Sequence, residues 1–303
     1  MNNEEDCFEL ILKRLQERHG VDFSMYRRCT VERRLARRMA ATGCGNHRAY
    51  LYLLEKSPEE YGRLVAHITI KVSRFFRNND VFEILSNEIF PDIIDEKENK
   101  NDDTLRIWCA GCAYGEEAYS VAITLVEYMK TSHKGTEDFK ISIFGTDIDE
   151  ESLNHARLGA YDARYLEKVD KKILDRHFTR LEEMKVRPAT DFMSTAHYQV
   201  IDSVRGMVHF SKHDLASETQ ISPPAGVVAN YDLILCRNLL IYFSAALRER
   251  AFSNLFNSLN PGGYLVLGKS ESIPDGLKTF LATKDSRNKV YKKKADAPRL
   301  SST

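Results

Sequence analysis

The sequence predicts an α/β protein in which a helical N-terminal domain precedes a doubly wound parallel sheet with a small antiparallel β insertion. Two observations carry this prediction. Apolar residues recur at helical spacing over residues 4–90, with no strand-like alternation. After the polar segment 95–104, short apolar runs alternate with longer amphipathic stretches, and this alternation is typical of a parallel sheet with crossover helices.

Composition places the chain among folded proteins of about two domains: it has 303 residues, 43% hydrophobic and 29% charged. The 44 Lys and Arg residues balance the 44 Asp and Glu residues, which argues against a general nucleic-acid binder. Six cysteines without a secretory leader predict reduced thiols and a cytoplasmic location. No apolar run approaches the ~18 residues of a membrane span.

The helical N-terminal domain is expected over residues 1–94. Its first helix has a face of regularly spaced apolar residues, Phe8, Ile11, Leu12 and Leu15. Gly20 ends that helix, a turn is expected at 43–45, and Pro58 opens a further helix.

The α/β domain is expected over residues 95–294, with 95–104 as a loop at its boundary. Between about 165 and 210 the sequence HYQVIDSVRGMVHF alternates as exposed antiparallel strands do, which predicts the β insertion. Residues 295–303 are expected to form a disordered tail.

A glycine-containing loop, residues 111–115, follows the first strand (LRIWCA) and precedes a helix that opens with Glu116 and Glu117. Ligands bind at the carboxyl ends of such strands, but a tight turn without a ligand explains the glycines equally well. Asp147 ends the second strand, where it can accept both hydroxyls of a ribose or cap a helix, as Asp149 can. Two carboxylates behind the loop would repel a pyrophosphate, so the pattern favours S-adenosylmethionine over NAD.

Several segments together resemble the CheR-type chemotaxis receptor methyltransferases: FFRNNDVF, WCAGCAYGEEAYSVAITL, FGTDID, HDL, LILCRNLLIYF and NPGGYLVLGKSES. The resemblance covers residues 60–290 approximately, and the helical N-terminal segment fits the family too. It implies a class I, Rossmann-like domain that uses S-adenosylmethionine to methylate glutamate side chains of chemoreceptors and releases S-adenosylhomocysteine.

The resemblance also implies residue roles. The residues that it assigns to the cofactor are Ser73, Arg77, Gly111, Glu117, Asp147, Asp214, Leu215, Cys236 and Arg237. Glu117 matches the acid that holds the methionine ammonium group, Asp147 the ribose acid, and Asp214 the acceptor for the adenine amino group. Arg77 and Tyr242 match the family's reaction centre. The chain departs from the family at Lys71, where Asn is common, and in the loop residues 112–114.

Methyl transfer to a glutamate is an in-line substitution whose nucleophile, with a pKa of about 4.3, is already ionised at neutral pH. No general base is needed, which accounts for the lack of a Ser-His-Asp arrangement in the sequence. No metal is expected.

Three alternatives compete with this assignment. Cys109 and Cys112 have the spacing of a redox CxxC motif, although the loop continues to Gly115 before the helix starts. A metal site would require three histidines, His197, His209 and His213. The third alternative is that the chain is not an enzyme but a signalling module, which binds S-adenosylmethionine and acts by docking to a partner.

A basic stripe over residues 26–40 includes Arg34, Arg37 and Arg38, and we expect it to dock the chemoreceptor's cytoplasmic helical bundle by charge. The alternative is a solvated helix face. Nucleic acid is not expected, because no aromatic residues are interleaved for base stacking. The family also suggests a receptor C-terminal peptide at the β insertion, although residues 181–200 match no peptide-binding pattern. The protein is expected to be a monomer.

Overall fold

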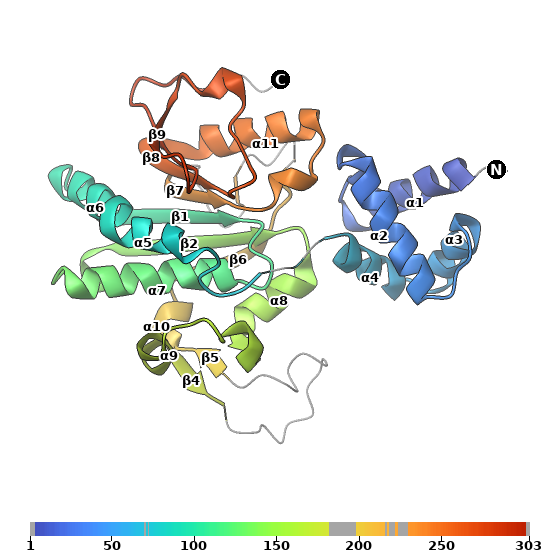
Figure 1. Cartoon of the computed structure of the whole chain (residues 1–303), viewed down its shortest axis with the longest axis horizontal. Helices are drawn as coiled ribbons and strands as arrows, with labels where there is room; N and C mark the ends of the chain where they lie inside the picture. Colours follow the sequence, from blue (N-terminus) through green and yellow to red (C-terminus); the bar gives the residue numbers. More distant parts are fainter. Residues whose placement is uncertain are drawn as a thin grey trace. The chain divides into compact units, whose positions relative to one another are not determined.

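The computed structural model describes residues 4–69, 71, 73–181, 198–215, 217, 222–223 and 230–300. The chain forms two compact units, one of residues 1–71 with 239–251 and one of residues 72–238 with 252–302. Within the described ranges, no helix is long and apolar enough to span a membrane. Figure 1 shows the elements of each unit in colours that follow the sequence.

The first unit is helical, as predicted. Its helices are α1 (Glu4–His19), α2 (Arg28–Ala41), α3 (His47–Lys56) and α4 (Glu59–Ile68), with short 3₁₀ turns over Phe23–Met25 and Leu240–Tyr242. Gly20 follows α1 with a φ of 72°, a left-handed conformation that favours glycine at a helix end. The apolar faces of the helices form the core, so Phe8, Leu35 and Leu54 are fully buried.

The second unit contains a seven-stranded sheet of the predicted doubly wound type. Its strands are β1 (Thr104–Ala110), β2 (Lys140–Asp147), β6 (Val208–Lys212), β7 (Tyr231–Cys236), β8 (Leu259–Leu267), β9 (Leu281–Asp285) and β10 (Val290–Lys293). They lie in the order β6-β2-β1-β7-β8-β10-β9. Strand β10 is antiparallel to both of its neighbours, and the pairs from β6 to β8 are all parallel. The strand order reverses between β1 and β7, and such a switch point is where ligands bind in open α/β sheets.

Helices cover both faces of the sheet, and the central strand β7 is buried along its whole length. They are α5 (Asn79–Ile84), a π-helical turn (Leu85–Ile89), α6 (Phe90–Asn99), α7 (Glu116–Thr131), α8 (Glu150–Leu158) and α11 (Ala245–Ser258). Alternate residues of β1, such as Ile107 and Cys109, join Leu85, Phe90 and Ile123 of the helices in one core. This alternation follows from the two-residue period of a strand.

The segment 95–104, expected to be a boundary loop, is helical up to Asn99. The polar residues are the solvent side of α6, where Lys100 pairs with Glu96 at i,i+4 spacing. Because Phe90 and Ile94 of this helix are buried in the core of the sheet, α5 and α6 belong to the second unit and the two units divide at residues 71 and 72. The sequence had placed that division at residues 94 and 95.

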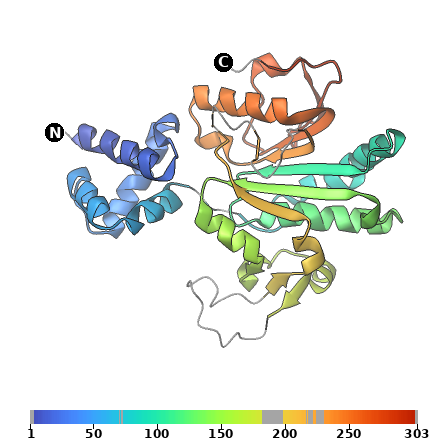
Figure 2. The same cartoon turned by 180° about the vertical axis from the view of Figure 1, so that it is seen from behind.

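A small antiparallel sheet is present, as predicted, in the order β3 (Ala160–Tyr161), β5 (Tyr198–Val200) and β4 (Phe178–Arg180), with helices α9 (Lys171–His177) and α10 (Asp202–Arg205). The second half of the alternating sequence is different from expectation, because β6 pairs in parallel with β2. Figure 2 shows β6 at the edge of the large sheet. Most of the segment considered for peptide binding, residues 182–197, lies outside the described residues.

The C-terminal tail also differs from the expected disorder where it is described. Asn257 of α11 donates to the Leu300 carbonyl oxygen at 3.0 Å and accepts from the Leu300 N–H at 2.8 Å. An amide side chain that satisfies both backbone groups holds the tail at this point. Residues 301–303 lie outside the described part of the chain.

Candidate active site

The loop after β1 forms a close turn against the end of β2. The backbone N–H groups of Gly111 and Cys112 both donate to the Thr146 carbonyl oxygen, at 2.8 and 2.9 Å. Gly111 and Gly115 have φ values of 73° and 88°. A Cβ atom on Gly115 would lie 2.9 Å from the Phe210 ring, and one on Gly145 would lie 2.5 Å from it. The glycines are therefore required by the turn and by this ring.

Asp147 is held at the end of β2 by two backbone donors. One carboxylate oxygen accepts from the Ala113 N–H and the other from the Asp149 N–H, each at 3.0 Å. Each carboxylate oxygen has a second lone pair. Asp149, and not Asp147, is the cap of α8, because its side chain accepts from the Ser152 N–H.

Glu117 forms a short ion pair with Arg237, in the turn after β7, at 2.7 Å. The Arg237 side chain is 2% exposed, and its other terminal nitrogen donates to the Arg77 carbonyl oxygen at 2.8 Å. Burial raises the pKa of Glu117, although Arg237 acts in the opposite direction. Three of the residues that the sequence singled out, far apart in the chain, are thus joined by one guanidinium group.

Glu116, to which the sequence assigned no role, precedes Glu117 at the start of α7. It is fully buried, and neither carboxylate oxygen has a hydrogen-bond partner among the described residues. Burial raises its pKa to about 7. Ser73 lies near enough to lower that pKa in part, but its hydroxyl does not reach hydrogen-bond geometry. The sequence gives no sign that Glu116 is the buried one, because both glutamates lie in the first turn of the same helix.

The end of β6 lies beside Asp147, whose carbonyl oxygen accepts from the His213 N–H at 3.0 Å. Asp214 and Leu215 follow directly, and Leu215 is buried, with its carbonyl oxygen bound by Asn254 of α11 at 3.1 Å. Cys236 ends β7 opposite Ala110 of β1 and is fully buried. Its side chain is therefore in the core, and only its backbone faces the loops at this edge of the sheet.

Glu271 was also missed. It is 5% exposed, and one of its oxygens accepts from the backbone N–H groups of Asn238 and Gly268, at 2.9 and 2.7 Å. It therefore fixes the turn after β7 to the end of β8. An acid three residues after the glycine that follows β8, Gly268, is the only signal in the sequence.

The remaining predicted residues belong to the first unit. Tyr242 is half-buried in a 3₁₀ turn, and its carbonyl oxygen accepts from the Arg27 N–H at 2.9 Å. Arg34, Arg37 and Arg38 lie on α2, whose other face, as predicted, is buried.

Arg38 differs from its neighbours on α2 because it is committed to a structural contact. Its guanidinium group makes two hydrogen bonds of 2.7 Å to the carboxylate of Glu60, which is 2% exposed. Tyr50 donates to the same carboxylate at 2.8 Å. Burial alone raises the pKa of Glu60, but these donors lower it overall. Arg37 is exposed and Arg34 half-exposed, and both lower the pKa of nearby His67, which burial lowers first.

The redox and metal alternatives gain no support. Cys109 and Cys112 are both buried, and burial raises the pKa of each thiol, which opposes the reactive thiolate form. His209 packs on Phe144 and His213 on Trp108, and His197 lies outside the described residues. Among the side chains that the structure describes, no group of three or more His, Cys, Asp or Glu residues could hold a metal ion.

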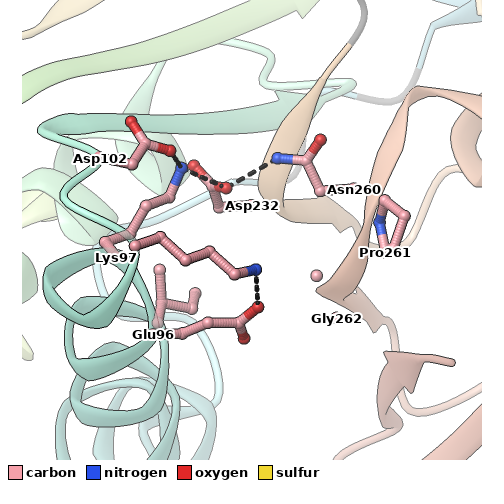
Figure 3. A pocket seen from close by; sticks show the side chains of 10 residues that line it. Glu96, Lys97, Asp102, Asp232, Asn260, Pro261 and Gly262 are labelled. Atoms are coloured by element: carbon pink, nitrogen blue, oxygen red, sulfur yellow. Dashed lines mark hydrogen bonds and ion pairs between the residues drawn. The ribbon is translucent and has the colours of Figure 1, made fainter. Parts of the chain in front are cut away.

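A cavity of about 250 Å³ lies at the amino ends of β1 and β7. This is the end of the strands opposite to the glycine loop and Asp147. Figure 3 shows that Lys97 points between Asp102 and Asp232, at 2.7 and 2.9 Å, while Asn260 donates to Asp232 from the other side. Because the charges of the largely buried Lys97 and Asp232 are satisfied within this cluster, we regard the cluster as structural.

The sheet order, the loop after β1 and the acid at the end of β2 define a class I S-adenosylmethionine-dependent methyltransferase fold. Two family models extend this result: the SAM-binding domain of CheR methyltransferases matches residues 71–290, and their all-alpha domain matches residues 6–69. The chain therefore belongs to the CheR methyltransferase family, and its cofactor is S-adenosylmethionine.

Curated relatives agree with this family. A chemotaxis protein methyltransferase of Borreliella burgdorferi is 31% identical over 276 residues, which are 90% of each chain. Chemotaxis protein methyltransferase 2 of Vibrio cholerae is 30% identical over 259 residues, which are 85% of this chain and 82% of the relative.

Proposed function

We propose that this protein methylates glutamate side chains of chemoreceptors, giving glutamate methyl esters and S-adenosylhomocysteine, in sensory adaptation. The observation that carries the proposal is the match to both CheR domains together with relatives named chemotaxis protein methyltransferases that cover 85–90% of the chain. The receptor methylation regions are the partners that this function requires, and the reaction takes place in the cytoplasm.

The residues at the switch point fit the cofactor. Asp147 is fixed at the end of β2 by two backbone N–H groups, and a carboxylate in this place is assigned to accept from the ribose hydroxyls. Glu117 is positioned by Arg237 through one oxygen, and its other oxygen is assigned to the methionine ammonium group. Asp214 and Leu215 are assigned to the adenine, and the glycines permit close approach of the backbone.

S-adenosylmethionine supplies an activated methyl group, so the protein has only to position the carboxylate and exclude water. We assign Arg77 to orient the substrate carboxylate by a charge-assisted hydrogen bond. Its backbone is fixed for this task, because the Arg77 carbonyl oxygen accepts from the buried Arg237. Tyr242 is assigned to seat the donor methyl group or to donate to the substrate.

The β insertion is a second docking site in this proposal. Strand β4 is an edge of the small sheet, and a receptor C-terminal peptide would add a strand there. Titration with receptor tail peptides tests this assignment separately, and saturable binding that an Arg180→Pro substitution on β4 weakens would support it.

The main test is transfer of a labelled methyl group to a receptor cytoplasmic fragment. Release of the label as methanol at alkaline pH identifies an ester and distinguishes it from N-methylation. Arg77→Ala and Tyr242→Phe should lower kcat more than they weaken cofactor binding. Tight cofactor binding with no transfer to any carboxylate would instead favour a docking module, and wild-type rates for both variants would refute the two assigned roles.

A further inference from the structure

A groove of about 550 Å³ lies on the second unit. One of its lining residues, Phe82, also borders the proposed cofactor site, because the Arg237 guanidinium carbon lies 5.8 Å from the centre of its ring. Its walls come from α5 and the π-helical turn, from the middle of α7, and from the segment that leads into α9. Figure 1 shows α7 between α5 and α9. The lining residues of α7, Ile123, Thr124 and Glu127, are two to three turns beyond Glu117 along that helix.

The floor of the groove is apolar. It is made by Phe76, Phe82, Ile123, Val169 and Ile173, of which Phe82 and Ile123 are buried and the other three half-buried. The rings of Phe76 and Phe82 are in edge contact, with centroids 5.3 Å apart. Apolar surface left half-covered in a hollow gains free energy when an apolar group fills it.

The rim is acidic. Glu83 stands on α5, and Glu167 and Asp170 stand on the segment that leads into α9; none of the three has a cationic partner within 4 Å among the described residues. Glu127 is different, because Arg176 pairs with it at 2.7 Å and the His177 ring lies within hydrogen-bond distance of it at 2.8 Å. With Lys168 as the only cation among the lining residues, the unpaired rim charges sum to about −2, a field that attracts cations.

The backbone is unusual at one side of the groove. Ser86 and Asn87, which line it, belong to the π-helical turn between α5 and α6. Such turns are rare in proteins and occur frequently at functional sites.

We propose that this groove docks a protein partner through a basic segment, in which an arginine or lysine stands next to an apolar side chain. The aliphatic stem of the cationic residue and the adjacent apolar side chain cover the phenylalanine and isoleucine floor, while the charged head reaches the rim carboxylates. This chemistry is opposite to that of the basic stripe on α2, so the groove suits a partner other than an acidic receptor surface. The proposal does not depend on the methyl-transfer function.

Binding of a fluorescein-labelled peptide of alternating leucine and arginine, followed by anisotropy with the full chain, tests the proposal. A peptide of alternating leucine and glutamate is the matched probe. We expect saturable binding of the basic peptide only. Glu83→Gln with Glu167→Gln should weaken it about tenfold, the size of two exposed ion pairs. Glu55→Gln with Glu137→Gln, which removes two exposed glutamates elsewhere, should leave the affinity unchanged.

Two further measurements identify the occupant. Ile173→Arg places a cation on an apolar stem in the groove and should abolish peptide binding, with folding verified by circular dichroism. An arginine–serine peptide tests the apolar anchor and should bind more weakly than the leucine–arginine peptide. Equal affinity for the wild type and the Glu83→Gln, Glu167→Gln variant would overturn the proposal. So would complete competition by the free amine agmatine with no dependence on leucine, since that result would assign the groove to a small cation.

Discussion

Asp147 shows how a single carboxylate is prepared for a ligand by its own backbone. The two backbone N–H groups that donate to it fix its orientation before any ligand arrives. We predict that Asp147→Ala weakens binding of S-adenosylmethionine by roughly 1.5–3 kcal/mol, the range of charge-assisted hydrogen bonds. Isothermal calorimetry measures the change, with Asp138→Ala as the control, and an unchanged affinity would remove Asp147 from the ribose role.

Glu116 gives a pH-dependent prediction, because burial raises its pKa from 4.5 to about 7. In the unfolded chain this carboxyl loses its proton at lower pH than in the folded protein. Stability therefore falls as the pH rises from about 4.5 to about 7, by up to roughly 3 kcal/mol above that window. Glu116→Gln removes the titration and should stabilise the protein more at pH 8 than at pH 5.

Thermal unfolding at both pH values measures this effect. A Gln amide in the same place is uncharged at either pH. The difference between the wild type and the Glu116→Gln variant therefore reports the titration of the Glu116 carboxyl group. If Glu116→Gln changes the melting temperature by the same amount at pH 5 and pH 8, Glu116 does not titrate in this range.

At the scale of elements, helix α2 combines two functions that its sequence does not separate. Arg38 stabilises the first unit through buried Glu60, whereas Arg37 is exposed and Arg34 partly so. Replacing all three arginines would therefore change both the stability of the first unit and its proposed docking to the receptor, and the two effects could not be separated. Arg38→Ala alone should destabilise the first unit by up to about 3–5 kcal/mol, because the buried Glu60 carboxylate then keeps only the Tyr50 hydroxyl and the exposed Arg63, 3.9 Å away.

The variant that tests receptor docking therefore combines Arg34→Gln with Arg37→Gln and retains Arg38. We expect the KM for a receptor fragment to rise several-fold at low salt and the difference to shrink at 0.5 M salt, because exposed charges are screened. Cofactor affinity should be unchanged. Arg48→Gln, an exposed arginine on α3, is the control. If the KM of the double variant equals that of the wild type at both salt concentrations, the arginines of α2 form a solvated helix face and do not dock the receptor.

Elements also show what the sequence can and cannot predict. The helices of the first unit followed from the spacing of residues such as Phe8 and Leu15, and the glycine loop and Asp147 followed from strand ends. The parallel pairing of β6 with β2 did not, because an alternating edge strand has the same pattern in either direction. The Arg237–Glu117 pair joins residues 120 positions apart, and no local pattern carries such a contact.

At the scale of the whole second unit, the cluster around Lys97 connects a covering helix with the amino ends of the central strands. Burial alone lowers the pKa of Lys97, but hydrogen bonds from its ammonium group to Asp102 and Asp232 raise it overall. Asp232 accepts from the Arg106 N–H at 2.9 Å as well, so α6, β1, β7 and β8 are joined at one buried carboxylate. This edge is opposite to the loops that carry the proposed chemistry.

We therefore predict that Lys97→Met lowers stability by about 3–5 kcal/mol while it leaves cofactor affinity intact, because it strands the buried Asp232 carboxylate. Lys97→Met with Asp232→Asn should recover part of this loss, since no buried charge then remains unpaired. Lys140→Met, which removes a pair with Asp103 that is exposed on both sides, should change stability by less than about 1 kcal/mol. Urea unfolding measures all three. A single variant no less stable than the double would show that the cluster contributes packing and not charge compensation.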